Sequence, residues 1–198
     1  MGVDLKLMAM PPNLTIEKFS TMEDYEDILS GIWESFFMED ELLHARAEGN
    51  DAKEKKLMYI LENIYELRKA YPGQDPKPYL FDSYYRAYGT LNFLVSKHCK
   101  VVGKPFFHFF KGKHVTSAVP NNGIHYHESE DVRRITDLLS GISFQELMEQ
   151  YDYEEVSKNA YKAKSPDELH YVEKEYQKLV LFFEHAAALN TYIVIHIY

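Results

Sequence analysis

The sequence predicts an α+β fold, in which a small sheet containing the N- and C-terminal strands is covered by several helices. Residues 3–8 alternate apolar and polar side chains, which is the period of a half-buried strand. Residues 192–198 are apolar on both faces apart from His196, which is typical of a strand inside a sheet. Between these strands, apolar residues recur at helical spacing in several stretches, so helices are expected to cover the sheet.

Two patterns of helical spacing occupy the first part of the chain. Ser20 and Glu23 form a capping-box signature, and the apolar residues behind them predict one helix that runs to about Ala47. A second helix is expected over residues 57–67, because its apolar residues again recur every three or four positions. The Tyr-Pro-Gly sequence at residues 71–73 ends that helix, since proline cannot continue the hydrogen-bond ladder.

The middle of the chain predicts a helix, a strand and a loop. Asp82 or Ser83 is expected to cap a third helix, whose apolar face includes Leu91. The β-branched and aromatic residues at 101–110 predict a strand or hairpin. Residues 112–127 are expected to form a loop, with a turn at residues 120–123.

Three helix starts follow in the last third of the chain. Ser129 begins a short helix, and Ser143 with Glu146 forms a second capping-box signature. The strongest start is the Ser-Pro-Asp-Glu sequence at 165–168, which combines an N-cap, a proline in the first turn and two acids at the positive end of the dipole. The helix that follows is expected to end at Asn190.

Length and composition favour one folded domain covering residues 1–198. A chain of this size buries roughly 70% of its extended surface, and 45% of its residues are hydrophobic, so a core can form without disulfides or a structural metal. No apolar stretch approaches the roughly 20 residues of a membrane span, so no membrane association is expected. The single cysteine, Cys99, cannot form an intramolecular disulfide, which fits a cytoplasmic location.

Charge is unevenly distributed along the chain. Residues 83–127 contain no Asp or Glu but six Lys and Arg and five of the nine His, although the whole chain carries a net charge of −9. If these cations gather on an accessible surface, they suit an acidic protein surface or a small anionic ligand. Alternatively, they neutralise acidic helices of the chain itself, such as residues 39–41. The net negative charge argues against nucleic-acid binding. The predicted binding residues are Lys104, Lys111, Lys113, His125, Tyr126 and His127.

A histidine cluster supports an alternative function, a metal-dependent or His-based hydrolase. Zinc accepts three or four His, Cys or carboxylate ligands, and a nearby Glu128 or Glu130 would serve as ligand or general base. No His-Glu-x-x-His sequence and no paired-cysteine motif is present, so we assign no metal, no cofactor and no catalytic residue. The histidines of this hypothesis are His108, His114, His125 and His127.

Four segments of the chain resemble a known family. They are Phe81-Asp82-Ser83 with Leu91-Asn92-Phe93-Leu94, Gly123-Ile124-His125-Tyr126-His127 before Val132, Leu147-Met148-x-x-Tyr151-Asp152, and residues 179–197 with the pair Ala186-Ala187. Together they resemble the bacterial YfbM-like family over residues 81–198. The resemblance implies an α+β fold. That family has no established activity, so the resemblance assigns no site residue.

The function that these observations favour is a non-enzymatic, cytoplasmic, bacterial protein-binding module, of an interaction or immunity-like kind. Charge segregation and a surplus of tyrosine, with 16 in the chain, point to a surface that contacts another protein. Whether the protein is an enzyme stays open, as do its oligomeric state and the identity of its partner.

Overall fold

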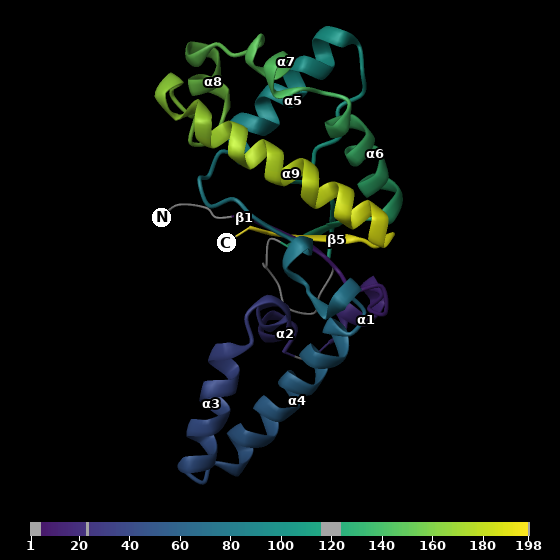
Figure 1. Ribbon diagram of the computed structural model, residues 1–198, viewed down its shortest axis with the longest axis vertical. Coiled ribbons are helices and arrows are strands. Elements are labelled where there is room, and N and C mark those ends of the chain that lie inside the picture. Colours follow the sequence, from purple (N-terminus) through teal and green to yellow (C-terminus); the bar gives the residue numbers. More distant parts are fainter. Residues whose placement is uncertain (1–4, 23, 116–123, 198) are drawn as a thin grey trace. The chain divides into compact units, whose positions relative to one another are not determined.

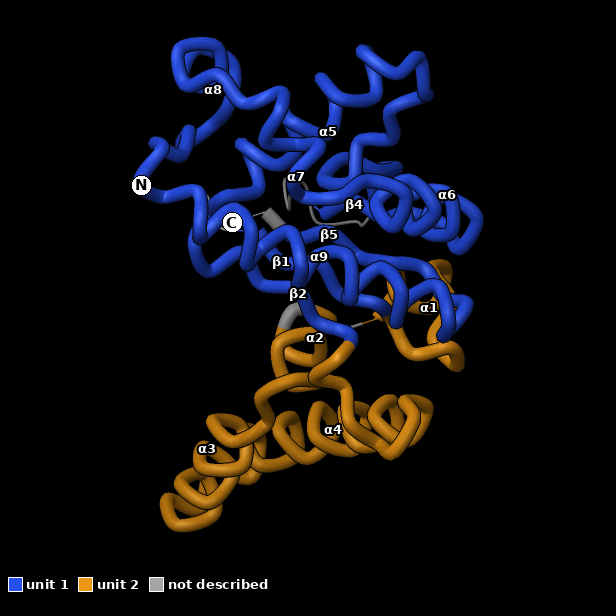
Figure 2. The backbone as a smooth tube through the Cα atoms, turned by 45° about the horizontal axis from the view of Figure 1, so that its top comes forward, with its two compact units in different colours: residues 1–9, 79–115, 119–198 blue, residues 10–78, 116–118 orange. Residues whose placement is uncertain are grey.

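The computed structural model describes residues 5–22, 24–115 and 124–197 (Figure 1). The chain forms two compact units, shown in blue and orange in Figure 2. Unit 1 contains the described residues of 5–9, 79–115 and 124–197, and unit 2 contains those of 10–78. The expectation of a single domain stays a prediction. Among the helices that the structure describes, none combines the length and apolar character needed to cross a bilayer.

Unit 1 is built on an antiparallel sheet with the strand order β2-β1-β5-β4-β3. In this sheet β5 lies between β1 and β4, so the predicted pairing of both chain ends in one sheet is confirmed. Val194 and Ile195 point to opposite faces of β5 and are both fully buried, as an interior strand requires. The strands are β1 (Leu5–Ala9), β2 (Leu80–Asp82), β3 (Lys113–His114), β4 (Ile124–His127) and β5 (Ile193–Ile197).

The longest helix of unit 1, α9, packs against β2 of the sheet and against α6 (Figure 1). The hydroxyl of Tyr176 lies 2.9 Å from the carbonyl of Leu139 and 2.8 Å from that of Ile142, which ties α9 to the end of α6. The capping box predicted at Ser143 forms, and the helix start predicted at Ser165 is present, where Ser165 and Glu168 also form a capping box. The helices are α5 (Tyr88–Val102), α6 (Ser129–Ser140), α7 (Phe144–Met148), α8 (Tyr153–Asn159) and α9 (Leu169–Leu189).

Unit 2 is helical in its described part. Its helices are α1 (Ile16–Ser20), α2 (Tyr25–Trp33), α3 (Phe36–Ala47) and α4 (Asp51–Arg68). The last two form an antiparallel hairpin and lie side by side in Figures 1 and 2. The prediction of a second helix is confirmed, because α4 buries the apolar side chains Leu57, Ile60, Leu61, Ile64 and Leu67. Tyr71-Pro72-Gly73 ends it, also as predicted, and a 3₁₀ turn at Pro72–Gln74 follows.

The prediction of one helix from Ser20 to Ala47 is wrong. Ser20 ends α1, and the chain breaks again between α2 and α3 at residues 34–35. Arg68 explains the second break, because its guanidinium donates hydrogen bonds to the carbonyls of Gly31 and Ile32 at 2.7 Å each. Those carbonyls lie in the last turn of α2, where no intrahelical amide reaches them. The predicted capping partner Glu23 lies outside the described residues.

The third helix begins later than predicted. The helix α5 starts at Tyr88 and not directly after Ser83, because the carboxylate of Glu175 on α9 accepts hydrogen bonds from the amides of Tyr85 and Ala87. The turn at residues 83–87 is therefore held by a side chain distant in sequence, which no local pattern indicates.

Two predictions for the following segment are corrected. The strand predicted at 101–110 is absent from the structure. Residues 101 and 102 instead form the last part of α5, and the segment that follows pairs with no strand although it buries Phe109 and Phe110. The predicted loop at 112–127 contains β3 and β4 instead. Gly112 permits this pairing, since a Cβ atom there would lie 2.0 Å from the carbonyl oxygen of Tyr126. The predicted turn at 120–123 lies outside the described residues.

Candidate functional site

The basic segment, defined as residues 100–113, runs from the end of α5 to the start of β3. It contains four lysines and no acidic residue. Lys100, Lys104 and Lys111 are exposed, and none of them forms an ion pair within the part of the chain that the structure describes. These three lysines therefore carry charge that is available to a ligand or partner.

Two other cations of the predicted basic region are already matched by acids. Lys113 forms an ion pair with Glu128, and Lys97 forms one with Glu155 on α8. Both pairs lie on the surface, so each contributes only about 0–1 kcal/mol to stability. The alternative that these cations neutralise the chain's own acids therefore holds for these two lysines.

Two of the predicted histidines attach β4 to the basic segment. His127 is 6% exposed, and its Nε2 atom lies 3.3 Å from the carbonyl oxygen of Phe109. His125 is half-buried, and its Nδ1 atom lies 3.2 Å from the carbonyl oxygen of Gly112. Burial lowers the pKa of the His127 imidazole, so this ring is neutral at pH 7 and acts as a structural anchor.

The predicted binding residues of the hairpin divide between two faces. Lys113 is directly opposite Tyr126 in the β3–β4 pair, so these two side chains share a face. His125 and His127 alternate with Tyr126 along β4 and point to the other face. The structure therefore brings Lys113 and Tyr126 together but separates them from the two imidazoles.

The predicted histidines of the hydrolase hypothesis do not form a metal-binding group among the described residues. The rings of His114 and His125 pack edge-to-face with centroids 5.3 Å apart. However, within residues 5–22, 24–115 and 124–197, no three His, Cys, Asp or Glu side chains come together to hold a metal ion. Glu128, a proposed ligand or base, is engaged by Lys113. No contact among the described residues therefore supports the hydrolase hypothesis.

The sequence patterns missed two apolar side chains beside the exposed lysines. Val101 is 62% exposed and Val102 is 47% exposed, at the end of α5 next to Lys100. Both were expected in a strand or hairpin. Extending the helical period of α5 beyond the buried Cys99 would have indicated that Val101 lies on the outer face.

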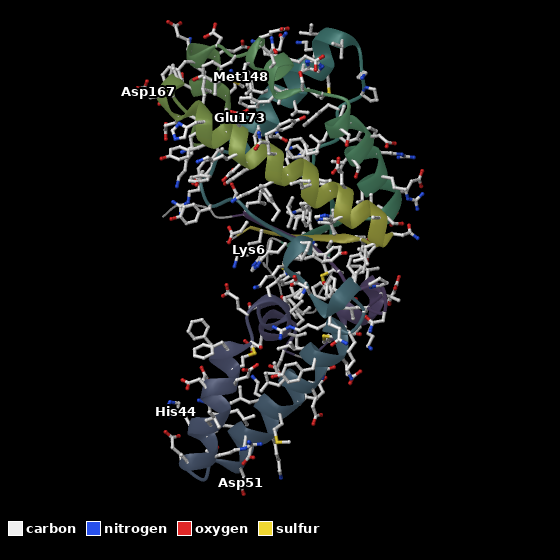
Figure 3. All side chains as sticks on the ribbon, viewed as in Figure 1. Lys6, His44, Asp51, Met148, Asp167 and Glu173 are labelled. Carbon is white, nitrogen blue, oxygen red and sulfur yellow. The ribbon has the colours of Figure 1, made fainter. Side chains whose placement is uncertain are left out.

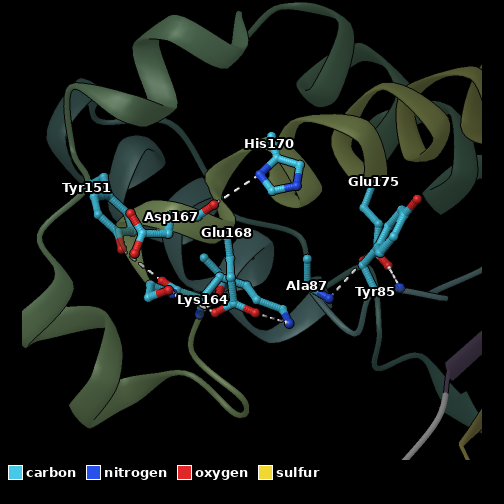
Figure 4. A network of polar contacts seen from close by, with 10 residues as sticks. Tyr85, Ala87, Tyr151, Lys164, Asp167, Glu168, His170 and Glu175 are labelled. Carbon is cyan, nitrogen blue, oxygen red and sulfur yellow. Dashed lines mark hydrogen bonds and ion pairs between the residues drawn. The ribbon is translucent and has the colours of Figure 1, made fainter.

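The sequence patterns also missed a buried carboxylate, Glu175 (Figure 4). Its oxygens accept hydrogen bonds from the Ser83 hydroxyl at 2.8 Å and from the amides of Tyr85 at 2.6 Å and Ala87 at 2.9 Å. Burial raises the pKa of this carboxyl group, although the three donors favour the charged form. A sequence signal was present, because Glu175 follows Val172 by three residues and therefore lies on the apolar face of the helix, where an acid is unusual.

Comparison with known proteins yields a family match. The model of a family described as Domain of unknown function (DUF1877) matches residues 47–196. No curated protein and no solved structure matches the chain. The basic segment, β4 and Glu175 all lie within the matched residues.

Proposed function

Starting from the fact that the chain belongs to the DUF1877 family, we propose that it is a non-enzymatic module that binds an acidic surface of another protein. The observation that carries this proposal is the exposure of Lys100, Lys104 and Lys111 without an ion pair in the described part of the chain. Hydrogen bonds from Ser143 are the main cause of the lowered pKa of Glu146, and the charge of Lys104 makes a smaller contribution. Lys104 and Glu146 nevertheless form no ion pair. The positive charges of these three lysines are therefore available to bind a partner.

The apolar neighbours favour a protein over a small anion. Protein interfaces combine an apolar centre with a polar or charged rim. The exposed side chains of Val101 and Val102 supply apolar surface directly beside Lys100. The lysines would accelerate association and select an acidic partner, while the valines would contribute buried area. Tyr126 and Lys113, which share a face of the β3–β4 hairpin, extend the proposed surface.

We further propose that this is a YfbM-like protein of the bacterial cytoplasm, with an interaction or immunity-like role. The resemblance of residues 81–198 supports the family placement, and the single buried thiol of Cys99 suits a reducing compartment. A protein with an immunity-like role acts by binding its partner and needs no catalytic group. The contacts of His125 and His127 with backbone carbonyls are consistent with a structural function for these two rings.

A charge-reversal experiment tests the proposal. Wild-type chain and a Lys100→Glu/Lys104→Glu/Lys111→Glu variant are immobilised, and proteins retained from bacterial lysate at low salt are quantified by mass spectrometry. A partner recovered with the wild type is then purified, and its affinity for both chains is measured. We expect the variant to bind this partner at least about tenfold more weakly, because charge complementarity is lost. Added salt should weaken wild-type binding.

The control carries the same change of charge elsewhere. Lys18, Lys55 and Lys174 are also exposed and form no ion pair within the described residues, so Lys18→Glu/Lys55→Glu/Lys174→Glu should retain the partner. Equal loss in both variants would attribute binding to overall charge and contradict the proposal. Retention of the partner by the basic-segment variant would contradict it as well. Circular dichroism of each variant verifies that folding is unchanged.

A further inference from the structure

Unit 2 contains a groove between α3 and α4 that the proposed function does not use. Its volume is about 350 Å³, near the lower end of about 300–1000 Å³ found for ligand pockets. The side that α3 contributes consists of Glu39, Leu42, Leu43 and Arg46. This spacing of three, four and seven residues places all four on one face of the helix.

The second side of the groove repeats this spacing on α4. It consists of Met58, Leu61, Glu62 and Tyr65, again separated by three, four and seven residues. Because α3 and α4 are antiparallel neighbours, the two rows run alongside each other (Figure 3, where His44 and Asp51 mark the end of the hairpin). A groove between two packed helices has the shape that receives a third helix.

The apolar surface of the groove is open to solvent. Leu43 is 63% exposed, Tyr65 42% and Met58 38%. Phe36 is 70% exposed and lies seven residues before Leu43, so it continues the same face of α3; Phe37 beside it is 69% exposed. With about 150–250 Å² per aromatic side chain, the two phenylalanines alone expose on the order of 200–350 Å². That approaches the largest apolar patch of an ordinary monomer, about 300–600 Å².

The charge along the groove is negative. Glu39 accepts hydrogen bonds from Ser35 at 2.6 Å and Tyr65 at 2.7 Å, which keep its carboxyl ionised by lowering its pKa. Glu62 is exposed and forms no ion pair within the described residues. The one cation that lines the groove, Arg46, is already held by Glu54 at 2.8 Å. A basic group is therefore the natural complement at Glu62.

The charge of the whole unit supports the same partner chemistry. Residues 10–78 contain fifteen Asp and Glu but only eight Lys and Arg. Two copies of this surface would repel each other, whereas a basic partner would be attracted. Self-association through the groove is accordingly disfavoured.

We propose that the α3–α4 groove binds an amphipathic, basic α-helix of another protein. Its apolar residues, spaced by three, four and seven positions, insert between Leu43 and Met58. Lysine or arginine on its flank lies beside Glu62. This surface belongs to unit 2, whereas the basic segment belongs to unit 1, so each binding proposal stands or fails independently.

Synthetic helices provide the probe. Three fluorescent peptides of about 18 residues, long enough to form a helix, are titrated with the full chain and followed by fluorescence anisotropy. The first has leucines at the required spacing and lysine flanks, the second has the same leucines with glutamate flanks, and the third is a scrambled version of the first. We expect the first peptide to bind at least about tenfold more tightly than the other two.

Two groove variants and one matched control locate the binding. Leu43→Glu should weaken binding of the basic helix at least about tenfold, because it places a carboxylate in the apolar row. Glu62→Lys should weaken it several-fold and improve binding of the glutamate-flanked peptide. Leu181→Glu makes the same change at a side chain that is 53% exposed on α9 and should leave binding unchanged.

Three results would overturn the proposal. Equal binding of the scrambled peptide and the basic helix would reduce the effect to general charge attraction. Equal binding of the basic helix to wild type and to Leu43→Glu would place its binding site elsewhere. A wild-type dimer in light scattering that Leu43→Glu converts to a monomer would identify a second copy of the chain as the occupant.

Discussion

Replacing Glu175 by alanine should destabilise unit 1 through the turn at residues 83–87. The carboxylate is 1% exposed and accepts hydrogen bonds from the Ser83 hydroxyl and from the amides of Tyr85 and Ala87. The hydroxyl can rotate to another acceptor, but the two amides cannot. An unpaired buried amide costs about 1–3 kcal/mol.

The expected loss in the free energy of unfolding is smaller than the summed contributions of the lost hydrogen bonds. Burial raises the pKa of Glu175, which shows that the site disfavours the charge, and alanine removes this unfavourable contribution. We therefore expect the free energy of unfolding to fall by about 2–4 kcal/mol. At about 2–4 °C per kcal/mol for a chain of this size, the melting temperature should fall by about 5–15 °C.

Urea denaturation followed by circular dichroism at pH 7 measures this change. Glu173→Ala on the same helix is the control, because Glu173 is exposed (labelled in Figure 3) and its removal should change stability by less than about 0.5 kcal/mol. Equal free energies of unfolding for the two alanine variants would refute the role of Glu175 as the acceptor for the turn.

The pH dependence of Glu175→Gln gives a second readout. A folded pKa above the ordinary value of 4.5 means that the folded state binds the proton more tightly than the unfolded state. The stability gained from the protonated carboxyl is therefore fully present below pH 4.5 and is lost as the pH rises through the folded pKa. The glutamine variant should lack this loss.

Three further predictions concern the sheet. Gly112→Ala should lower the free energy of unfolding by about 1–3 kcal/mol, because its Cβ would meet the Tyr126 carbonyl at 2.0 Å; an unchanged urea midpoint would contradict the close approach. Because burial lowers the pKa of His127, the unfolded chain takes up its proton first, so stability should be lost as the pH falls below 6.5. In urea titrations, the free energy of unfolding of His127→Gln should fall less than that of the wild type between pH 7.5 and 5.5. An identical pH dependence for the two chains would count against a buried neutral imidazole. Deletion of residues 192–198 should abolish cooperative unfolding in calorimetry, since β5 pairs with both β1 and β4; a sharp melting transition would refute this.

Elements with a strong local signal were predicted well. The capping box at Ser143 and the helix start at Ser165 form as expected, and Asn190 ends α9 in the left-handed conformation with φ of 53°. A capping residue acts through its nearest backbone amides, so its effect can be recognised without the rest of the chain. The interior position of β5 was also predictable, because only a strand buried on both faces tolerates a uniformly apolar sequence.

Elements defined by distant contacts were predicted poorly. The break between α2 and α3 depends on Arg68, more than thirty residues later in the chain. The late start of α5 depends on Glu175, 88 residues from Ala87. Neither partner can be recognised from the residues it stabilises.

The candidate site was predictable in composition but not in geometry. The absence of acids from residues 83–127 drew attention to Lys104 and Lys111, and both side chains are exposed; their role in binding stays a prediction. The same pattern did not indicate that Lys113 is paired with Glu128 or that His127 is buried against Phe109. Exposure and pairing depend on which segments meet, and the pairing of β3 with β4 brings the Tyr126 carbonyl so close to Gly112 that a Cβ atom there would lie 2.0 Å from it.

The amino-acid order alone determined the α+β class, the terminal strands and the charge asymmetry, because these follow from periodicity, capping and composition over a few neighbouring residues. Only the tertiary structure decided which cations remain unpaired in the described residues, which carboxylate is buried at Glu175, and that α3 and α4 form an open apolar groove. The physical reason is that burial and ion pairing are properties of contacts between segments, and these contacts form only when the chain folds.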